Sequence, residues 1–124
     1  MLCGSFSQSV GSNVNYFKCN VTLCGNEYVV ASVCTNGGVY TGDTVLSLYD
    51  SVGVEVAYND DSGVCGVGAT GSQLSYTVGV GVGCSVYVLR EYCYEGLACT
   101  GTAAVEVTQL STSPSSSPSS ESFW

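Results

Sequence analysis

The chain has no histidine and only two basic residues, Lys18 and Arg90, among its 124 residues. Without histidine it can form neither a Ser-His-Asp triad nor a Cys-His pair, and it offers no imidazole to zinc or copper. Two isolated cations cannot neutralise the phosphates of a nucleic acid or form a polybasic membrane anchor. These absences exclude most familiar hydrolase chemistry, and they exclude nucleic acid as a partner.

Long hydrophobic runs are also missing. Gly, Ser, Asn or Asp interrupts every apolar stretch before it reaches the roughly 18 residues that can cross a bilayer, so we expect no membrane span. The first ten residues, MLCGSFSQSV, lack the basic and apolar regions of a secretory signal. We therefore expect a soluble chain whose signal has been removed, or a piece of a longer protein.

Cysteines are the most informative residues that are present: Cys3, Cys19, Cys24, Cys34, Cys65, Cys84, Cys93 and Cys99. An even number of them in a short chain is typical of disulfides formed in an oxidising environment. The alternative is a zinc site, which would need two pairs of the C-x2-C type, and no such pair occurs in the sequence. The cysteines thus predict a disulfide-rich protein that is extracellular or on the cell surface.

Disulfide pairing can be predicted only in part, because eight cysteines allow about a hundred arrangements. The residues between Cys93 and Cys99 can form a turn that brings the two Cα atoms within bridging distance. Three weaker predictions complete the set: Cys24 with Cys34, Cys65 with Cys84, and, by exclusion, Cys3 with Cys19.

Residues 14–108 alternate hydrophobic and polar side chains with the period of two that is typical of β-strands. The pattern occurs in segments 14–23, 28–34, 44–50, 54–58, 73–82, 85–92 and 102–108. We expect the third and fourth segments to form a hairpin, and we expect the alternate residues from Phe17 to Leu23 and from Leu74 to Val82 to face the core. Short strands with Gly-rich connections predict an all-β fold, a disulfide-rich and jelly-roll-like β-sandwich of about seven strands.

We divide the chain into an N-terminal segment (1–13), the sandwich (14–110) and a Ser/Pro-rich tail or linker (111–124), and we expect both end segments to reach neighbouring subunits. The tail cannot form a core and has the composition of O-glycosylated stalks, with an unmodified linker as the alternative. Its candidate O-glycosylation sites are Ser111, Thr112, Ser113, Ser115, Ser116, Ser117, Ser119 and Ser120. Phe123 and Trp124 form the kind of aromatic pair that anchors in a partner's pocket.

Acidic residues concentrate around one loop. Asn59, Asp60 and Asp61 directly follow one predicted strand, and Asp43 precedes the strand that pairs with it. Carboxylate and amide oxygens at a loop are ligands that calcium prefers, so calcium is a candidate ligand, while no cofactor is required. The alternatives are ordinary turn chemistry, in which Asx side chains bond to the local backbone, and a pair of glycosidase carboxylates, for which so small a domain leaves no substrate cleft.

One modification signal is specific enough to name. Asn20-Val21-Thr22 is the only N-glycosylation sequon of the chain, and the strand alternation places Asn20 on the solvent face. Of the other polar strand residues, we expect Arg90 to pair with a surface carboxylate. Three tyrosines are expected either in cross-strand packing or in contact with a sugar or another subunit: Tyr87, Tyr92 and Tyr94.

Four motifs follow one another in an informative order: GDTVLSLYDSVGVEVAYNDDSG, SQLSYTV, SVYVLR and GTAAVEV. This order resembles the bacterial pre-peptidase C-terminal (PPC) domain and its Cys-rich relatives in secreted proteins of eukaryotic microbes, over residues 14–108. The resemblance implies a jelly-roll-like accessory module without catalysis of its own, which in some relatives binds calcium or extracellular polymers such as collagen or polysaccharide. By position, the acidic loop of a calcium-binding member matches Asp43, Asn59, Asp60 and Asp61.

The sequence as a whole predicts a non-catalytic structural module of a secreted glycoprotein, a subunit of an extracellular fibre, appendage or surface coat. Its expected partners are copies of itself or other extracellular glycoproteins. The alternative is a calcium-dependent accessory module that binds carbohydrate or matrix, with glycans as partners. Only 10% of the residues are charged, so we expect sugar or neighbouring subunits to cover the surface.

Overall fold

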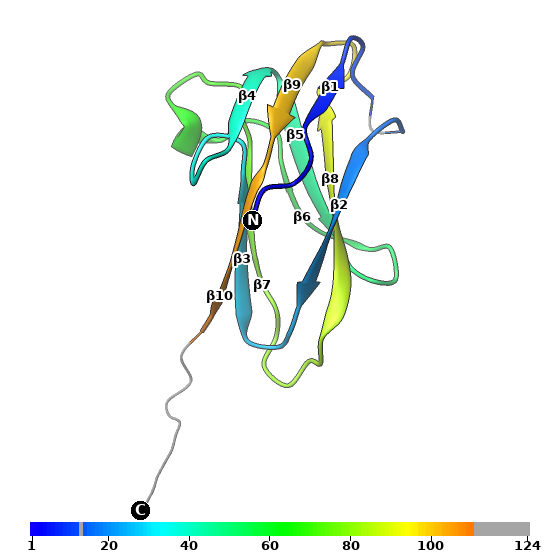
Figure 1. Cartoon of the computed structure of the whole chain (residues 1–124), viewed down its shortest axis with the longest axis vertical. Coiled ribbons are helices and arrows are strands. Elements are labelled where there is room, and N and C mark those ends of the chain that lie inside the picture. Colours follow the sequence, from blue (N-terminus) through cyan, green and yellow to red (C-terminus); the bar gives the residue numbers. More distant parts are fainter. Residues whose placement is uncertain (13, 111–124) are drawn as a thin grey trace, which may run out of the picture.

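The computed structural model describes residues 1–12 and 14–110. The strands are β1 (Phe6–Gln8), β2 (Phe17–Leu23), β3 (Glu27–Ser32), β4 (Val39–Gly42), β5 (Thr44–Tyr49), β6 (Glu55–Asn59), β7 (Gln73–Thr77), β8 (Ser85–Cys93), β9 (Cys99–Thr102) and β10 (Ala104–Gln109), and one 3-10 turn, η1, covers Gly63–Cys65 (Figure 1). The described ranges contain no α-helix. The predicted O-glycosylation sites and the predicted partner contacts at Phe123 and Trp124 lie outside the described residues.

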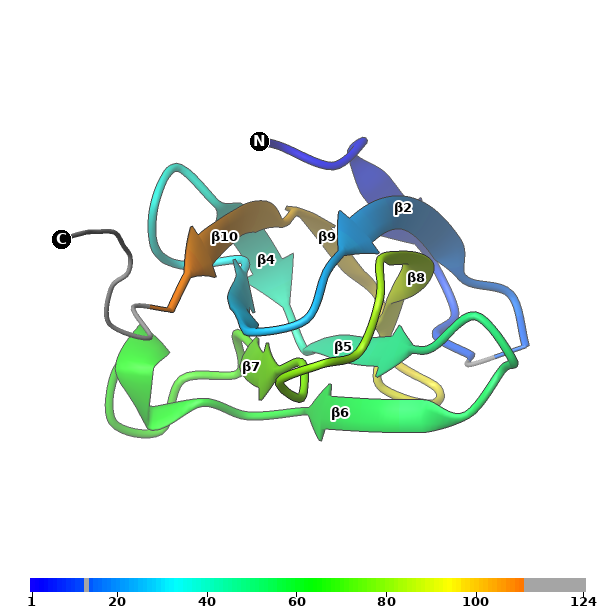
Figure 2. The ribbon, with the colours of Figure 1, turned by 90° about the horizontal axis from the view of Figure 1, so that it is seen from below.

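The strands pack as a β-sandwich, which confirms the predicted all-β class. One layer is a four-stranded sheet in the order β2-β8-β5-β6, and two three-stranded sheets, β10-β3-β7 and β1-β9-β4, lie opposite it. All the strand pairs are antiparallel. Because β9 leads into β10 through Ala103, one chain segment joins the two smaller sheets. Seen along the long axis, the sheets surround one interior, and β6 lies beside β7 (Figure 2).

The core forms where inward-facing residues of the opposing sheets meet. In the β10-β3-β7 sheet, Ala31 lies opposite Val105 on one side and Leu74 on the other, and all three are buried. From the four-stranded sheet, Leu46 and Leu89 enter the same cluster, and neither has any exposed surface. The period-two alternation of the sequence thus becomes two apolar faces that bury each other.

All seven predicted strands are present, and β5 and β6 form the predicted hairpin. The inward face differs from the prediction in two places. The strand β7 ends at Thr77, and Val80 and Val82 are 78% and 50% exposed. The cause is a turn, in which the N–H of Val82 donates to the carbonyl of Gly79 at 3.2 Å. Phe17, at the end of the edge strand β2, is 43% exposed.

The N-terminal segment, expected to lie apart from the sandwich and to reach a neighbour, is built into it over residues 1–12. Its strand β1 pairs with β9, and the ring of Phe6 is only 2% exposed. Gly101 makes this possible, since a Cβ at that position would lie 2.7 Å from the Phe6 ring. The α-amino group of Met1 also donates a hydrogen bond to the carbonyl of Val105 at 2.8 Å. The sandwich therefore begins at the first residues rather than at residue 14.

All eight cysteines are joined in four disulfides, as predicted. Two pairings are confirmed, Cys3–Cys19 and Cys93–Cys99. The pairings of Cys24 with Cys34 and of Cys65 with Cys84 are wrong, because the observed bonds are Cys24–Cys84 and Cys34–Cys65.

The length of β3 explains the error. Cys24 precedes this strand and Cys34 follows it, so the extended backbone holds the two apart by about 20 Å, far beyond bridging distance. Cys84 instead precedes β8, whose first residue, Ser85, lies opposite Leu23. One step further along the same antiparallel register, Cys24 faces Cys84. The strand register therefore decides this pair.

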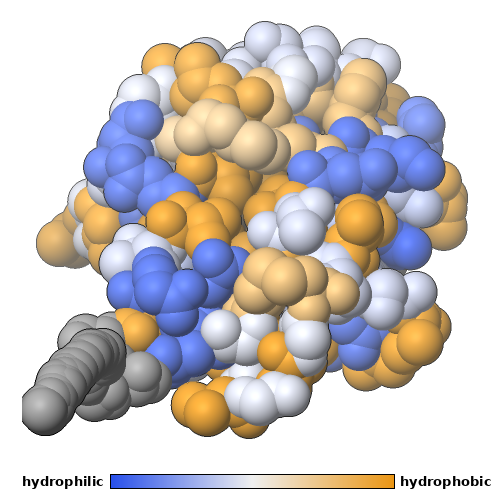
Figure 3. Space-filling view, turned by 60° about the horizontal axis from the view of Figure 1, so that its bottom comes forward, coloured by the Kyte–Doolittle hydropathy of each residue, from blue (hydrophilic) through white to orange (hydrophobic). Residues whose placement is uncertain are grey.

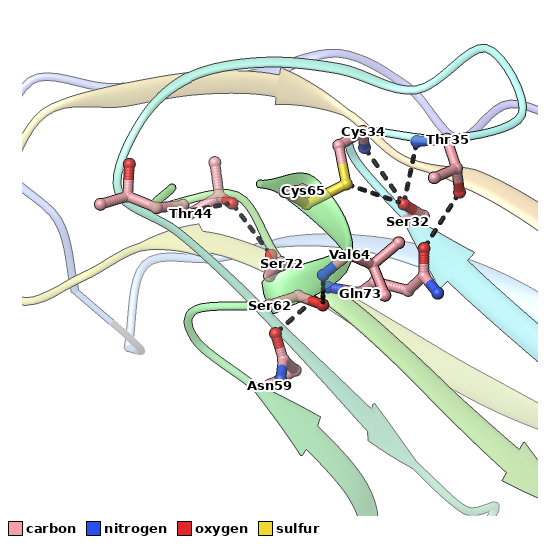
Figure 4. The surroundings of a disulfide bond; sticks show 11 residues. Ser32, Cys34, Thr35, Thr44, Asn59, Ser62, Val64, Cys65, Ser72 and Gln73 are labelled. Atoms are coloured by element: carbon pink, nitrogen blue, oxygen red, sulfur yellow. Dashed lines mark hydrogen bonds between the residues drawn. A yellow bond between two sulfur atoms is a disulfide. The ribbon is translucent and has the colours of Figure 1, made fainter. Parts of the chain in front are cut away.

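The Cys34–Cys65 disulfide fastens η1 to the end of β3 (Figure 4). Hydrogen bonds support it: the hydroxyl of Ser32 accepts from the N–H groups of Cys34 and Thr35, both at 3.1 Å. On the other side of the turn, the hydroxyl of Ser62 accepts from the N–H of Val64 at 3.2 Å. This loop is consequently held by both a covalent bond and local caps.

Candidate functional site

The predicted acidic loop lies at one end of the β5–β6 hairpin. Asp43 directly precedes β5, while Asp60 and Asp61 directly follow β6. Because the two strands are antiparallel neighbours, the start of one and the end of the other meet at the same edge of the sheet. One carboxylate oxygen from each of these three residues lies within 4.8 Å of the others. The structure therefore brings together three of the four predicted ligands, which we call the acidic triad.

Asn59, the fourth predicted ligand, has a structural contact. Its Oδ1 accepts a hydrogen bond from the backbone N–H of Gln73 at 3.2 Å, which ties the end of β6 to the start of β7. This contact joins residues fourteen apart in the sequence, so it is not the local turn chemistry considered as an alternative, and the three carboxylates remain as candidate ligands.

The triad is electrostatically strained. Burial, followed by hydrogen bonding and charge repulsion from Asp60, raises the pKa of Asp43 to about 6. Burial and the neighbouring charge of Asp61 raise the pKa of Asp60 as well. Close carboxylates that cannot all ionise freely either share protons or bind a cation. At neutral pH, the arrangement favours a positive charge between the three side chains.

Two oxygens of the triad, Asp43 Oδ1 and Asp60 Oδ1, are buried and have no hydrogen-bond partner within residues 1–12 and 14–110. A buried carboxylate oxygen without a partner is costly, and a metal ion or water can satisfy it. The donor set consists of oxygen atoms alone, which suits a hard divalent cation such as calcium.

A second candidate site is a pocket of about 420 Å³ on the four-stranded sheet. Four tyrosines, two glutamates and one valine line it: Tyr49, Tyr58, Tyr92, Tyr94, Glu55, Glu95 and Val45. Tyr58 and Tyr94 are about half exposed, at 53% and 46%, whereas Tyr92 is almost buried. We call this site the tyrosine pocket.

The strand register produces this pocket. Leu46 and Leu48 of β5 face the core, so the alternate residues Val45 and Tyr49 face outward. Val45 lies opposite Tyr92 of β8, and Tyr49 lies opposite Glu55 of β6. Outward side chains of three neighbouring strands are thereby gathered on one face.

Arg90 of β8 lies on the same outer face. We expected a surface carboxylate as its partner, whereas the structure places its guanidinium over two aromatic rings. The guanidinium carbon lies 4.1 Å from the ring centroid of Tyr16 and 3.9 Å from that of Tyr49. These distances are typical of strong cation–π contacts.

The three tyrosines singled out from the sequence have different roles. Tyr87 is buried in the core, with its ring centroid 6.0 Å from that of Tyr76, so it serves in packing. Tyr92 shares a hydrogen bond of 3.1 Å with the hydroxyl of Ser47. Tyr94 is half exposed and lines the tyrosine pocket. The outward positions of Tyr49 and Tyr58 in the alternating pattern are the signal that could have identified this pocket.

The sequon lies on an accessible strand. Asn20 is in β2, an edge strand of the four-stranded sheet, and its side chain is exposed, as predicted. Thr22, the third residue of the sequon, is exposed as well. The acceptor side chain is therefore exposed to solvent in the folded protein.

Glu91 is a buried carboxyl group that the sequence analysis did not single out. It is only 1% exposed, and its Oε1 accepts a hydrogen bond from the N–H of Ala103 at 3.3 Å. Burial raises the pKa of Glu91 to about 7 despite this hydrogen bond. Since the side chain points into the core, we regard it as part of the fold.

Comparison with family models, curated proteins and solved structures finds no match for this chain. The resemblance to the PPC domain thus depends on the motifs in residues 14–108 and stays a prediction. Within the described part of the chain, no helix has the length and apolar character needed to cross a membrane.

Proposed function

We propose that this chain is a non-catalytic structural module of a secreted glycoprotein, a subunit of an extracellular fibre, appendage or surface coat. Four disulfides in so small a domain support an oxidising location outside the cell. The exposed sequon at Asn20 supports glycosylation.

The main support for the assembly role is that two loops, 63–69 and 79–83, contain no charged residue. Each exposes apolar side chains: Val67 is fully exposed in the first loop, and Val80 is 78% exposed in the second. Disulfides hold both loops, one inside the first at Cys65 and one directly after the second at Cys84.

The two loops lie at different ends of the molecule. In Figure 1 the loop that contains η1 lies near the upper end, whereas the β7–β8 loop forms the lower tip. Figure 3 shows hydrophobic residues between hydrophilic ones on the surface seen from below. Apolar contacts at two ends of a subunit suit head-to-tail association. Such association continues into an open filament unless the subunits close into a ring.

The test uses the full chain, produced with its disulfides formed, in sedimentation velocity and negative-stain microscopy. We expect concentration-dependent rods or sheets, and we expect Val67→Lys and Val80→Lys each to raise the concentration needed for assembly about tenfold or more. Val52→Lys is the matched control, since Val52 is 81% exposed in the turn between β5 and β6. Dispersed monomers at high concentration would refute the proposal, as would an equal effect of the Val52 variant.

A second candidate function is calcium-dependent binding of carbohydrate or matrix, and the two unpartnered oxygens of the acidic triad favour it. Calorimetry with calcium tests it. We expect heat of binding and a higher melting temperature, both lost in Asp60→Asn and both retained in Glu106→Gln, whose carboxyl group lies on the exposed side of β10. No heat and no change in melting temperature at about millimolar calcium would refute this function.

A further inference from the structure

The tyrosine pocket is a concave aromatic surface, and one of its walls is fixed by a hydrogen bond. The hydroxyls of Tyr92 and Ser47 are hydrogen-bonded at 3.1 Å, so the Tyr92 ring is held in place. Tyr58 and Tyr94 stand beside it with about half of their surface exposed. A ligand can therefore contact the tyrosine rings without first opening the fold.

The residues that line the pocket carry negative charge only. Glu55 and Glu95 line it, and none of the lining residues is basic. Burial and the charge of Glu55 raise the pKa of Tyr49, whereas the nearby positive charge of Arg90 lowers it. The negative charge of the lining residues attracts cations and repels anions.

The same face already holds one cation by aromatic contact. The guanidinium of Arg90 lies over the rings of Tyr16 and Tyr49, and Tyr49 also lines the pocket. Rings that bind a delocalised, weakly hydrated cation on this face provide the chemistry that a second such cation needs.

We propose that the tyrosine pocket binds the alkylated ammonium group of an organic cation. An alkylated ammonium is weakly hydrated, so the rings can replace its water at small cost, and the two glutamates balance its charge. A neutral sugar could stack on the rings and donate hydroxyl hydrogen bonds to the two carboxylates, but it would gain no charge attraction from them.

Two sources can supply this group: a free quaternary ammonium compound, or a methylated lysine side chain of a protein. Calorimetric titration of the full chain with choline and with a short peptide containing trimethyllysine distinguishes them. The tighter ligand of the two identifies the source. A chelator is present throughout, so that the result is independent of any metal at the acidic triad.

The control ligand is 3,3-dimethylbutanol, which has the shape of choline without its charge. We expect it to bind at least about tenfold more weakly than choline. Equal binding of the two, binding of glucose without binding of choline, or no binding of either ammonium ligand at about 10 mM would overturn the proposal.

Two variants test the walls of the pocket. We expect Tyr58→Ala and Glu55→Gln each to weaken choline binding about tenfold, because the first removes one ring and the second removes one charge. Both side chains are exposed, so the fold does not depend on them. Tyr28→Ala, on β3 in the other layer, is the matched control and should leave binding unchanged. Equal weakening by the control would contradict the assignment.

Discussion

Replacement of the buried carboxyl group of Glu91 by an amide is expected to change how stability depends on pH. In the folded chain Glu91 is 1% exposed, and burial raises its pKa from the usual 4.5 to about 7. The unfolded chain gives up this proton at lower pH than the folded chain does. Glu91→Gln keeps the shape of the side chain and an oxygen that can accept the hydrogen bond from Ala103, but it removes the ionisation.

The sign and the size of this pH effect follow from the difference between the pKa values of Glu91 in the folded and the unfolded chain. Below about pH 4.5 both states hold the proton, so Glu91 costs no stability there. Between about pH 4.5 and 7 the unfolded chain binds fewer protons than the folded chain, so the free energy of unfolding falls as pH rises. A difference of about 2.5 between the two pKa values corresponds to about 3 kcal/mol, which is fully lost above pH 7.

Urea unfolding of the two proteins at about pH 4.5 and about pH 8 measures this effect. We expect similar stability at the lower pH and an advantage of about 3 kcal/mol for Glu91→Gln at the higher pH. Asp43 and Asp60 also have raised pKa values, but they are common to both proteins, so the difference between the two reports Glu91. Glu106→Gln is the surface control. A constant difference at both pH values, or a less stable variant at the higher pH, would refute the reasoning.

Three further outcomes are expected. Gly101→Ala should lower the free energy of unfolding by about 1–3 kcal/mol, because its Cβ would meet the ring of Phe6. Gly4→Ala should have little effect, since no described atom lies within 4 Å of the added Cβ. Thermal unfolding measures both variants, and equal effects would contradict the packing of Phe6 on Gly101. Replacing Cys24 and Cys84 by Ser should lower the free energy of unfolding by about 4 kcal/mol, about twice the loss expected on removing Cys93–Cys99. The reason is that the first bridge closes a sequence separation of 60 residues and the second a separation of 6. Denaturant titration measures both losses, and a reversed order would contradict the loop argument. Asn20→Gln should remove one N-linked glycan from protein made in a secretory pathway, and unchanged intact masses would show that the sequon is not used.

The strands that the sequence predicts are those whose own residues alternate. Segment 27–32 buries Val29 and Ala31 and pairs on both sides, so its pattern is visible locally. Strand β9, with the sequence CTGT, has no such pattern. It is a strand because β1 and β4 pair with its two edges, and those partners are distant in sequence. Short strands of this kind depend on tertiary context rather than on propensity.

The candidate sites show the same limit. The acidic triad could be expected, because a hairpin brings the start of β5 next to the end of β6 within a short stretch of sequence. The tyrosine pocket could not be expected in the same way, since Tyr92 reaches Val45 only through the register of β5 with β8. The same register decides the disulfide partner of Cys24. The register between strands that are distant in sequence leaves no local signal, whereas the alternation along one strand indicates which of its residues point outward.

The disulfides also determine how far the molecule can stretch. A load applied between Met1 and Leu110 would follow the covalent bridges and bypass sequence separations of 16, 60 and 6 residues, through Cys3–Cys19, Cys24–Cys84 and Cys93–Cys99. Only about a quarter of this length of chain could then extend, even after the strands had separated. Under load the module therefore behaves as a short tether, because most of its chain lies inside closed disulfide loops. A reducing agent would open these loops and lengthen the tether.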